Sequence, residues 1–100
     1  MGRMIFAILV TAAIGTPVRA EVIKYQCTGG SGTVAITVDT KTLTSVVSGN
    51  GVAVPGQAQV SNTQIVLTEN GHFGWSETID RKTGAAVDTD GDTETCRRVK

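Results

Sequence analysis

Cations are too few and too scattered in this sequence to build a surface for nucleic acid. Nine lysine and arginine residues balance nine acidic residues. Without Arg3 and Arg19, which lie in the first 20 residues, seven basic residues face nine acidic ones. Nucleic-acid-binding proteins gather cations on one face, because phosphate contacts supply much of their affinity. We therefore expect no nucleic-acid partner.

Residue types that carry catalysis or bind metals are also scarce. His72 is the only histidine, and no serine or cysteine forms a recognisable catalytic motif with it. A tetrahedral zinc site needs about four ligands, and the chain adds only His72 to its two cysteines. The glycine-rich stretches lack the following helix and lysine of a phosphate loop. We expect a protein without enzymatic activity, cofactor or metal.

One acidic stretch, residues 88–94, partly resembles a calcium-binding loop. Asp88, Asp90 and Asp92 match the first, third and fifth ligand positions of an EF-hand. Position six is Thr93 instead of glycine, and position twelve is Val99 instead of glutamate. We interpret the stretch as a solvated turn and expect no tight calcium binding.

No apolar run is long enough to cross a membrane. The longest, Met4 to Ile14, has 11 residues, whereas a transmembrane helix needs about 20. Arg3 precedes this run and Val18-Arg19-Ala20 follows it, which is the layout of a secretory signal peptide. We expect residues 1–20 to be a signal peptide and residues 21–100 to be a single domain. The protein is then periplasmic or secreted, without a stable membrane anchor.

Cysteine is limited to Cys27 and Cys96. Export would place both residues in an oxidising compartment, where disulfides form and persist. Two cysteines allow one pairing, which would join the first predicted strand to the last. In the chain-entropy model, closing a loop of about 69 residues removes roughly 4 kcal/mol of unfolded-state freedom. We expect a Cys27–Cys96 disulfide.

Helix-forming blocks are absent after residue 20, where threonine, valine and glycine dominate. Apolar and polar residues alternate between glycine-rich turns at spacings of about ten residues. Strands are expected at 22–28, 34–38, 43–47, 52–60, within both arms of 63–79, at 85–88 and at 95–99. The pattern predicts an all-β fold, a small antiparallel meander of seven or eight strands closed as a barrel or a two-layer sandwich.

Two residue pairs that are typical of turns make the predicted strand arrangement more specific. Asn70-Gly71 is favoured in two-residue type I′ hairpins. Its second arm would turn Phe73 and Trp75 inward with Ile79, making this hairpin the centre of the core. Pro55-Gly56 interrupts the segment 52–60, and proline cannot donate to a ladder. That strand should lie at a sheet edge or be broken.

Glu77 is the polar residue that fits the alternation least. It falls in phase with Trp75 and Ile79, and a buried unpaired carboxylate is costly. We expect a bulge that turns Glu77 outward, with pairing to a cation such as Arg81 as the alternative. A role in orienting a ligand is a third interpretation.

A few residues also support a family resemblance. Tyr25-Gln26-Cys27 lies on the first strand, Trp75-Ser76 lies late in the chain, and Cys96 lies on the last strand. In this layout the mature chain resembles the periplasmic and membrane-bound inhibitors of C-type lysozyme. In that family a Ser-Gly-x-x-Tyr segment and a later lysine-bearing loop enter the lysozyme cleft. Here Ser61 is followed by Asn62 and no tyrosine, and Glu77 stands where the family has a lysine.

A second resemblance concerns compartment alone. The segment Ile79-Asp80-Arg81-Lys82-Thr83-Gly84 looks like a turn found in small exported alphaproteobacterial proteins without an assigned activity.

Together these observations predict a non-enzymatic exported β-barrel that binds a protein, with lysozyme as the partner that the resemblance implies. The candidate contact residues are Ser61, Asn62 and His72, on loops expected at one end of the barrel, and Glu77. Two other functions remain open, a carrier of a small ligand in the barrel mouth and a structural envelope protein. An interior filled by side chains would count against the carrier, because about eight strands leave room for at most one small molecule. The oligomeric state is left open.

Overall fold

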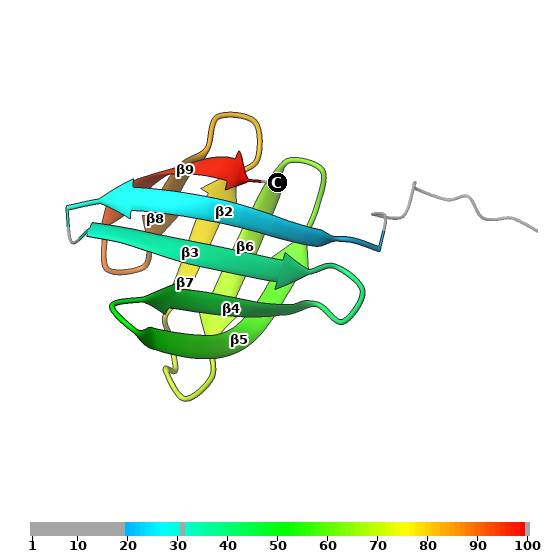
Figure 1. Cartoon of the computed structure of the whole chain (residues 1–100), viewed down its shortest axis with the longest axis horizontal. Coiled ribbons are helices and arrows are strands. Elements are labelled where there is room, and N and C mark those ends of the chain that lie inside the picture. Colours follow the sequence, from blue (N-terminus) through cyan, green and yellow to red (C-terminus); the bar gives the residue numbers. More distant parts are fainter. Residues whose placement is uncertain (1–19, 31, 100) are drawn as a thin grey trace, which may run out of the picture.

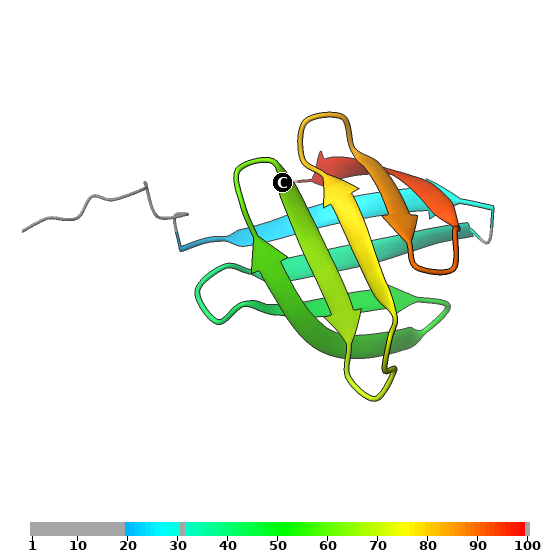
Figure 2. The ribbon, with the colours of Figure 1, turned by 180° about the vertical axis from the view of Figure 1, so that it is seen from behind.

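In the part of the chain that the structure describes, the alternating sequence pattern produces eight antiparallel strands, each paired with its neighbours in chain order (Figures 1 and 2). The computed structural model describes residues 20–30 and 32–99. Its strands are β2 (Val22–Gly29), β3 (Gly32–Asp39), β4 (Thr44–Gly49), β5 (Val52–Val60), β6 (Gln64–Glu69), β7 (Ser76–Asp80), β8 (Ala85–Asp88) and β9 (Thr93–Val99). Because β9 returns to pair with β2, the meander closes into a barrel. The predicted all-β class is confirmed, and of the two architectures the barrel is the one formed.

The expected signal peptide falls almost wholly on residues 1–19, which lie outside the described residues. Within the described ranges, the structure contains no helix of the length and apolarity needed to span a membrane.

The seam between the first and last strands carries the predicted disulfide. Cys27 lies directly opposite Cys96 in the β2–β9 register, and the two residues are bonded through their sulfur atoms. Both side chains are buried. The disulfide prediction is confirmed, and the bond fastens the pairing that closes the barrel.

The barrel interior is filled by aliphatic side chains from alternate positions of the strands. On β2, exposed and buried residues alternate strictly from Val22 to Thr28, as expected for a strand with one buried face. The largest fully buried side chains are Ile23, Cys27, Ile36, Val38, Ile65, Leu67 and Ile79. They come from both halves of the chain, so the core is shared around the barrel.

The β6–β7 connection differs from the predicted hairpin. Its last ladder pair is Thr68 with Ser76, and residues 70–75 form a longer loop instead of a two-residue turn. Phe73 is 98% exposed, so it does not belong to the core. The two-residue turn with both central φ angles positive occurs at Asn50-Gly51, where φ is 53° and 79°. These are the signs that a type I′ turn requires.

Strand β5 is also different from its prediction, since it runs unbroken through Pro55 and pairs with strands on both sides. The carbonyl of Pro55 accepts a hydrogen bond from Asn70 N. In an antiparallel strand the N and O atoms of one residue point to the same side. The nitrogen of Pro55 therefore also points to the β6 side, at a level beyond Glu69, the last residue of β6. The ladder does not extend that far, so the missing N–H of Pro55 removes no hydrogen bond from it.

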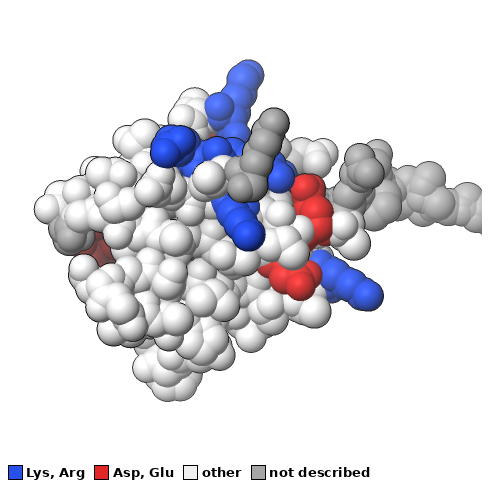
Figure 3. All heavy atoms as spheres, in the orientation of Figure 1, with Lys and Arg blue, Asp and Glu red and all other residues white. Residues whose placement is uncertain are grey.

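A meander places successive loops at opposite ends, and here the two ends differ in charge. The β2–β3, β4–β5, β6–β7 and β8–β9 loops lie at one end, which we call the acidic end. Six of the nine acidic residues belong to it, namely Glu69, Glu77, Asp88, Asp90, Asp92 and Glu94. The other end, which we call the basic end, carries Lys24, Lys41, Arg81, Lys82 and Arg98. The face drawn in Figure 3 shows Lys and Arg toward its top and right, and none at its left-hand end.

Candidate functional site

A pocket of about 640 Å³ opens into the barrel at the acidic end. Carboxylates come to it from four strands and the β8–β9 loop, while Val34 and Val47 give it an apolar side. The five acidic residues that line it are Glu69, Glu77, Asp88, Asp92 and Glu94, and Trp75 lies beside them. We call this pocket the acidic mouth. Among the described residues that line it, none is a lysine, an arginine or a histidine.

Glu77 faces into the barrel and is only 5% exposed. Strand β7 keeps its regular pairing there, with Leu67 on one side and Asp88 on the other, so no bulge turns the carboxyl outward. Arg81 follows the opposite end of β7 and cannot pair with it. Both the outward bulge and the Arg81 pairing are therefore corrected, because regular alternation prevails and β7 separates the two side chains.

The partners of Glu77 are other carboxyl groups. Burial, a side-chain hydrogen bond with Glu94, and the negative charges of Glu94, Asp88 and Glu69 together raise its pKa to about 8. Each of these causes disfavours the ionised form. At neutral pH Glu77 therefore keeps its proton and shares it with Glu94. Among the described residues, no nitrogen donor is hydrogen-bonded to Glu77.

The β6–β7 loop places aromatic side chains at the rim of the mouth. His72 stacks on Trp75, with ring centroids 5.8 Å apart and an interplanar angle of 17°. His72 Nδ1 also lies 3.5 Å from Glu69 Oε1. Trp75 is half-buried at the mouth, whereas Phe73 projects almost fully into solvent. The sequence pattern did not predict that Phe73 lies at the surface. It extends the strand alternation of apolar and polar residues through residues 70–75, which form a loop.

The β8–β9 loop is built around Asp88. Its Oδ1 accepts hydrogen bonds from Asp90 N at 2.9 Å and Asp92 N at 3.0 Å, which is how aspartate stabilises tight turns. Among the described residues, one group of three metal-ligand side chains has its ligand atoms within 4.8 Å of one another, Cys27, Glu94 and Cys96. Their two sulfurs are bonded to each other. The carboxylates of the mouth are thus spaced more widely than one compact ion requires.

The candidate contact residues do not lie together. His72 and Glu77 belong to the acidic end, but Ser61 and Asn62 lie in the β5–β6 loop at the basic end. Ser61 has a local structural role, since its Oγ accepts from Gln64 N at 3.1 Å and its carbonyl accepts from Arg81 Nη1 at 2.7 Å. The expectation that both loops share one end is corrected, because consecutive loops of a meander alternate between ends.

No protein-family model, curated protein or solved structure matches this chain. The candidate site is therefore interpreted from its own residues and their surroundings.

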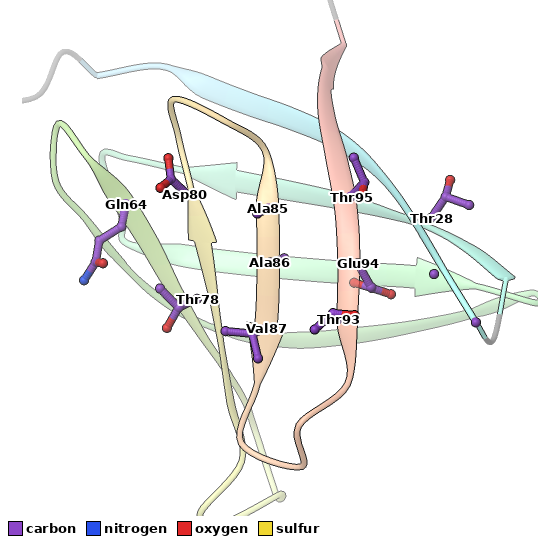
Figure 4. A pocket seen from close by; sticks show the side chains of 12 residues that line it. Thr28, Gln64, Thr78, Asp80, Ala85, Ala86, Val87, Thr93, Glu94 and Thr95 are labelled. Atoms are coloured by element: carbon purple, nitrogen blue, oxygen red, sulfur yellow. The ribbon is translucent and has the colours of Figure 1, made fainter.

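A larger hollow of about 730 Å³ lies against strands β6–β9 and β2 (Figure 4). Small side chains dominate its lining, among them the hydroxyl-bearing Thr78, Thr93 and Thr95. Its carboxylates are Glu94, shared with the acidic mouth, and Asp80, which already accepts the N–H groups of Lys82 and Thr83. Because no charged groups converge there as they do at the acidic mouth, the mouth is the better candidate site.

Proposed function

We propose that this protein is a non-enzymatic exported binding protein whose acidic end docks a cationic protein. The observation that carries the proposal is the acidic mouth, where four carboxylates and the protonated Glu77 gather beside Trp75, with Phe73 exposed on the same loop. A concentration of one charge sign in a hollow attracts oppositely charged partners and speeds their encounter. The family that the chain resembles also acts by binding a protein.

Different residues of the acidic end would make different contributions to the contact. Phe73, fully exposed at the loop tip, would be buried by a partner and act as an apolar anchor. A lysine or arginine of the partner would enter the mouth between Glu69 and Glu94, where the face of Trp75 that His72 leaves uncovered adds a cation–π contact. The core strands hold these groups in place.

The filled interior favours protein binding over the carrier function. The aliphatic side chains at the centre of the barrel are fully buried against one another. At the acidic mouth, carboxylates would disfavour an apolar ligand. A small cationic ligand remains compatible with the same pocket, and the experiment below includes one.

The test measures binding of the purified mature protein to C-type lysozyme, a basic protein and the partner that the resemblance implies, together with inhibition of its activity. We expect a Kd that rises as salt is increased from about 0.05 to about 0.5 M, because screening weakens the attraction. Phe73→Ala should weaken binding about tenfold or more. Val22→Ala is the matched control, because it shortens a half-exposed apolar side chain at the basic end.

Two negative outcomes have different meanings. Lysozyme that keeps full activity at a large excess of this protein would remove the inhibitor version. The broader proposal fails if immobilised wild type retains no more cationic protein from an envelope extract than Glu69→Gln/Glu94→Gln does. Binding of free arginine, with no protein retained, would favour the small-ligand function instead.

A further inference from the structure

A second, smaller pocket lies at the basic end of the barrel, away from the acidic mouth. Its volume is about 270 Å³, and three cations, Arg81, Lys82 and Arg98, line it together with Tyr25. Arg98 lies directly opposite Tyr25 in the β2–β9 register, while Arg81 and Lys82 come from the β7–β8 turn. The pocket therefore collects positive charge from two separate elements.

Tyr25 supplies the observation that points to a ligand. Its side chain is buried on the inner face of β2 and only 5% exposed, yet it lines this pocket. Within the described residues its hydroxyl has no hydrogen-bond partner. Buried tyrosine hydroxyls normally find a partner, because an unsatisfied buried polar group is costly. A group entering the pocket could accept the hydrogen of this hydroxyl.

Contacts within the protein hold Arg81 and Arg98 in place but do not occupy all of their N–H groups. Arg81 Nη1 donates to the carbonyl of Ser61 at 2.7 Å, which fixes the guanidinium and leaves its other N–H groups. Arg98 Nη2 lies 3.3 Å from Glu21 Oε1. Within the described ranges, neither Arg81 nor Lys82 has an acidic partner closer than 4.0 Å.

The β7–β8 turn is fixed against β9, so the pocket does not depend on a loose loop. Cys96 N donates to the Gly84 carbonyl at 2.7 Å. A Cβ at Gly84 would overlap the Cys96 carbonyl, and its φ of +84° also favours glycine. At the start of the turn, Asp80 Oδ1 accepts from Lys82 N at 2.8 Å. The backbone that carries Arg81 and Lys82 is therefore closely positioned.

We propose that this pocket binds a phosphate group, with the Tyr25 hydroxyl donating to one oxygen and Arg81, Lys82 and Arg98 donating to the others. The donors come from three elements, β2, β9 and the β7–β8 turn, and their number suits an oxyanion with several oxygens better than a carboxylate with two. Free phosphate, a soluble phosphate ester and a lipid headgroup share this chemistry. The proposal is independent of the acidic mouth, which lies at the other end.

The experiment titrates inorganic phosphate into the mature protein and follows backbone amide shifts by NMR. We expect saturable shifts around the β7–β8 turn, with affinity reduced about tenfold in Tyr25→Phe, which removes a donor to a charged group. Lys82→Gln should have a similar effect, because it removes a positive charge from the pocket. Lys41→Gln is the matched control, because it removes an exposed cation at the same end but outside the pocket. The affinity of Lys41→Gln for phosphate should stay within about twofold of that of wild type.

Further arms distinguish the sources of the phosphate group. Glycerol phosphate represents soluble esters, while phosphatidylglycerol vesicles and phosphatidylcholine vesicles represent charged and neutral membranes. Tighter binding of one phosphate source, reduced in Tyr25→Phe, supports the proposal and identifies the source. No saturable binding of any source, or binding that Tyr25→Phe and Lys82→Gln leave unchanged, overturns it. Unchanged amide spectra outside the pocket verify that Tyr25→Phe is folded.

Discussion

Glu77 occupies a position that an apolar side chain would fill in an ordinary barrel, between Leu67 on β6 and Asp88 on β8. Its pKa of about 8, against an ordinary 4.5, means that the folded chain holds this proton more tightly than the unfolded chain does. Between these two values the folded state carries the additional proton, so stability decreases as pH rises. The stability that this proton contributes to the folded state is fully present below about pH 4.5 and is lost by about pH 8.

We predict that the free energy of unfolding decreases from pH 5 to pH 8, with a limiting slope of about 1.4 kcal/mol per pH unit. Urea denaturation at several pH values measures it. Glu77→Gln should flatten the slope, because an amide cannot ionise. Asp90→Asn, at an exposed carboxylate of the same end, should leave the slope as in wild type. A wild-type slope equal to that of Glu77→Gln would contradict the assignment.

The sequence identified Glu77 but not its surroundings. Alternation with Ile79 correctly placed it in phase with the core, and the cost of burying a charge then suggested a bulge or a cation. Its hydrogen-bond partner, Glu94, lies on β9 and comes close through the closure of the barrel. That proximity depends on strand order and register, which a single sequence specifies only through packing.

At the scale of elements, β5 passes so close to β6 that one position must be glycine. A Cβ added to Gly56 would overlap the carbonyl oxygen of Thr68 and lie 2.9 Å from its carbon. Both of these atoms belong to the backbone, so a change of rotamer cannot relieve the contact. Glycine within a strand commonly marks such a close approach.

We predict that Gly56→Ala destabilises the barrel by at least about 2 kcal/mol, since overpacking forces backbone shifts. Gly30→Ala is the control, because a Cβ at Gly30 meets no atom within 4 Å. Its effect should stay within about 0.5 kcal/mol. Chemical denaturation of both variants measures the difference, and equal stabilities would show that β5 is free to move away from β6.

Strand positions were the most predictable elements, whereas loops were the least. Alternation from Val22 to Thr28 gave β2 almost to its ends, because one buried face requires that pattern. The Asn-Gly signal occurs twice, and only Asn50-Gly51 forms the two-residue turn. At Asn70-Gly71 the ladder stops at Ser76, so Phe73 and Trp75 belong to a loop. Local turn preference alone does not decide where pairing stops.

At the scale of the whole molecule, the disulfide joins the two strands whose pairing depends on barrel closure. Cys27 and Cys96 are separated by 69 residues but are direct partners between β2 and β9. All other neighbouring strands are joined by short connections within hairpins. The cross-link therefore acts where the chain has the most entropy to lose on closing.

We predict that Cys27→Ser/Cys96→Ser lowers the free energy of unfolding by about 2 to 5 kcal/mol. Changing both residues avoids leaving a reactive thiol. Denaturant titration measures the loss, and mass spectrometry after alkylation without reductant should find no free thiol in wild type. A double variant as stable as wild type would mean that β2 and β9 pair strongly without the cross-link.

The candidate sites were less predictable than the fold, because each combines residues that are distant in sequence. The sequence distinguishes Tyr25 only by its place near Cys27, and it suggests Arg81 only as a partner of Glu77. Their common pocket with Arg98 follows from the β2–β9 register and the position of the β7–β8 turn. The acidic mouth likewise requires carboxylates of four strands to meet at one end.

The antiparallel pairing of β2 with β9 also determines how this protein can be attached to other molecules. The start of β2 and the end of β9 lie at the same end, with Lys24 opposite Val99, as Figure 1 shows. A tag, fusion partner or sensor surface joined beyond either strand would leave the acidic mouth facing outward. The same attachment would crowd the pocket beside Tyr25. Immobilised protein is therefore suited to testing the proposed cationic partners, while the proposed phosphate binding is better measured on the untagged chain in solution.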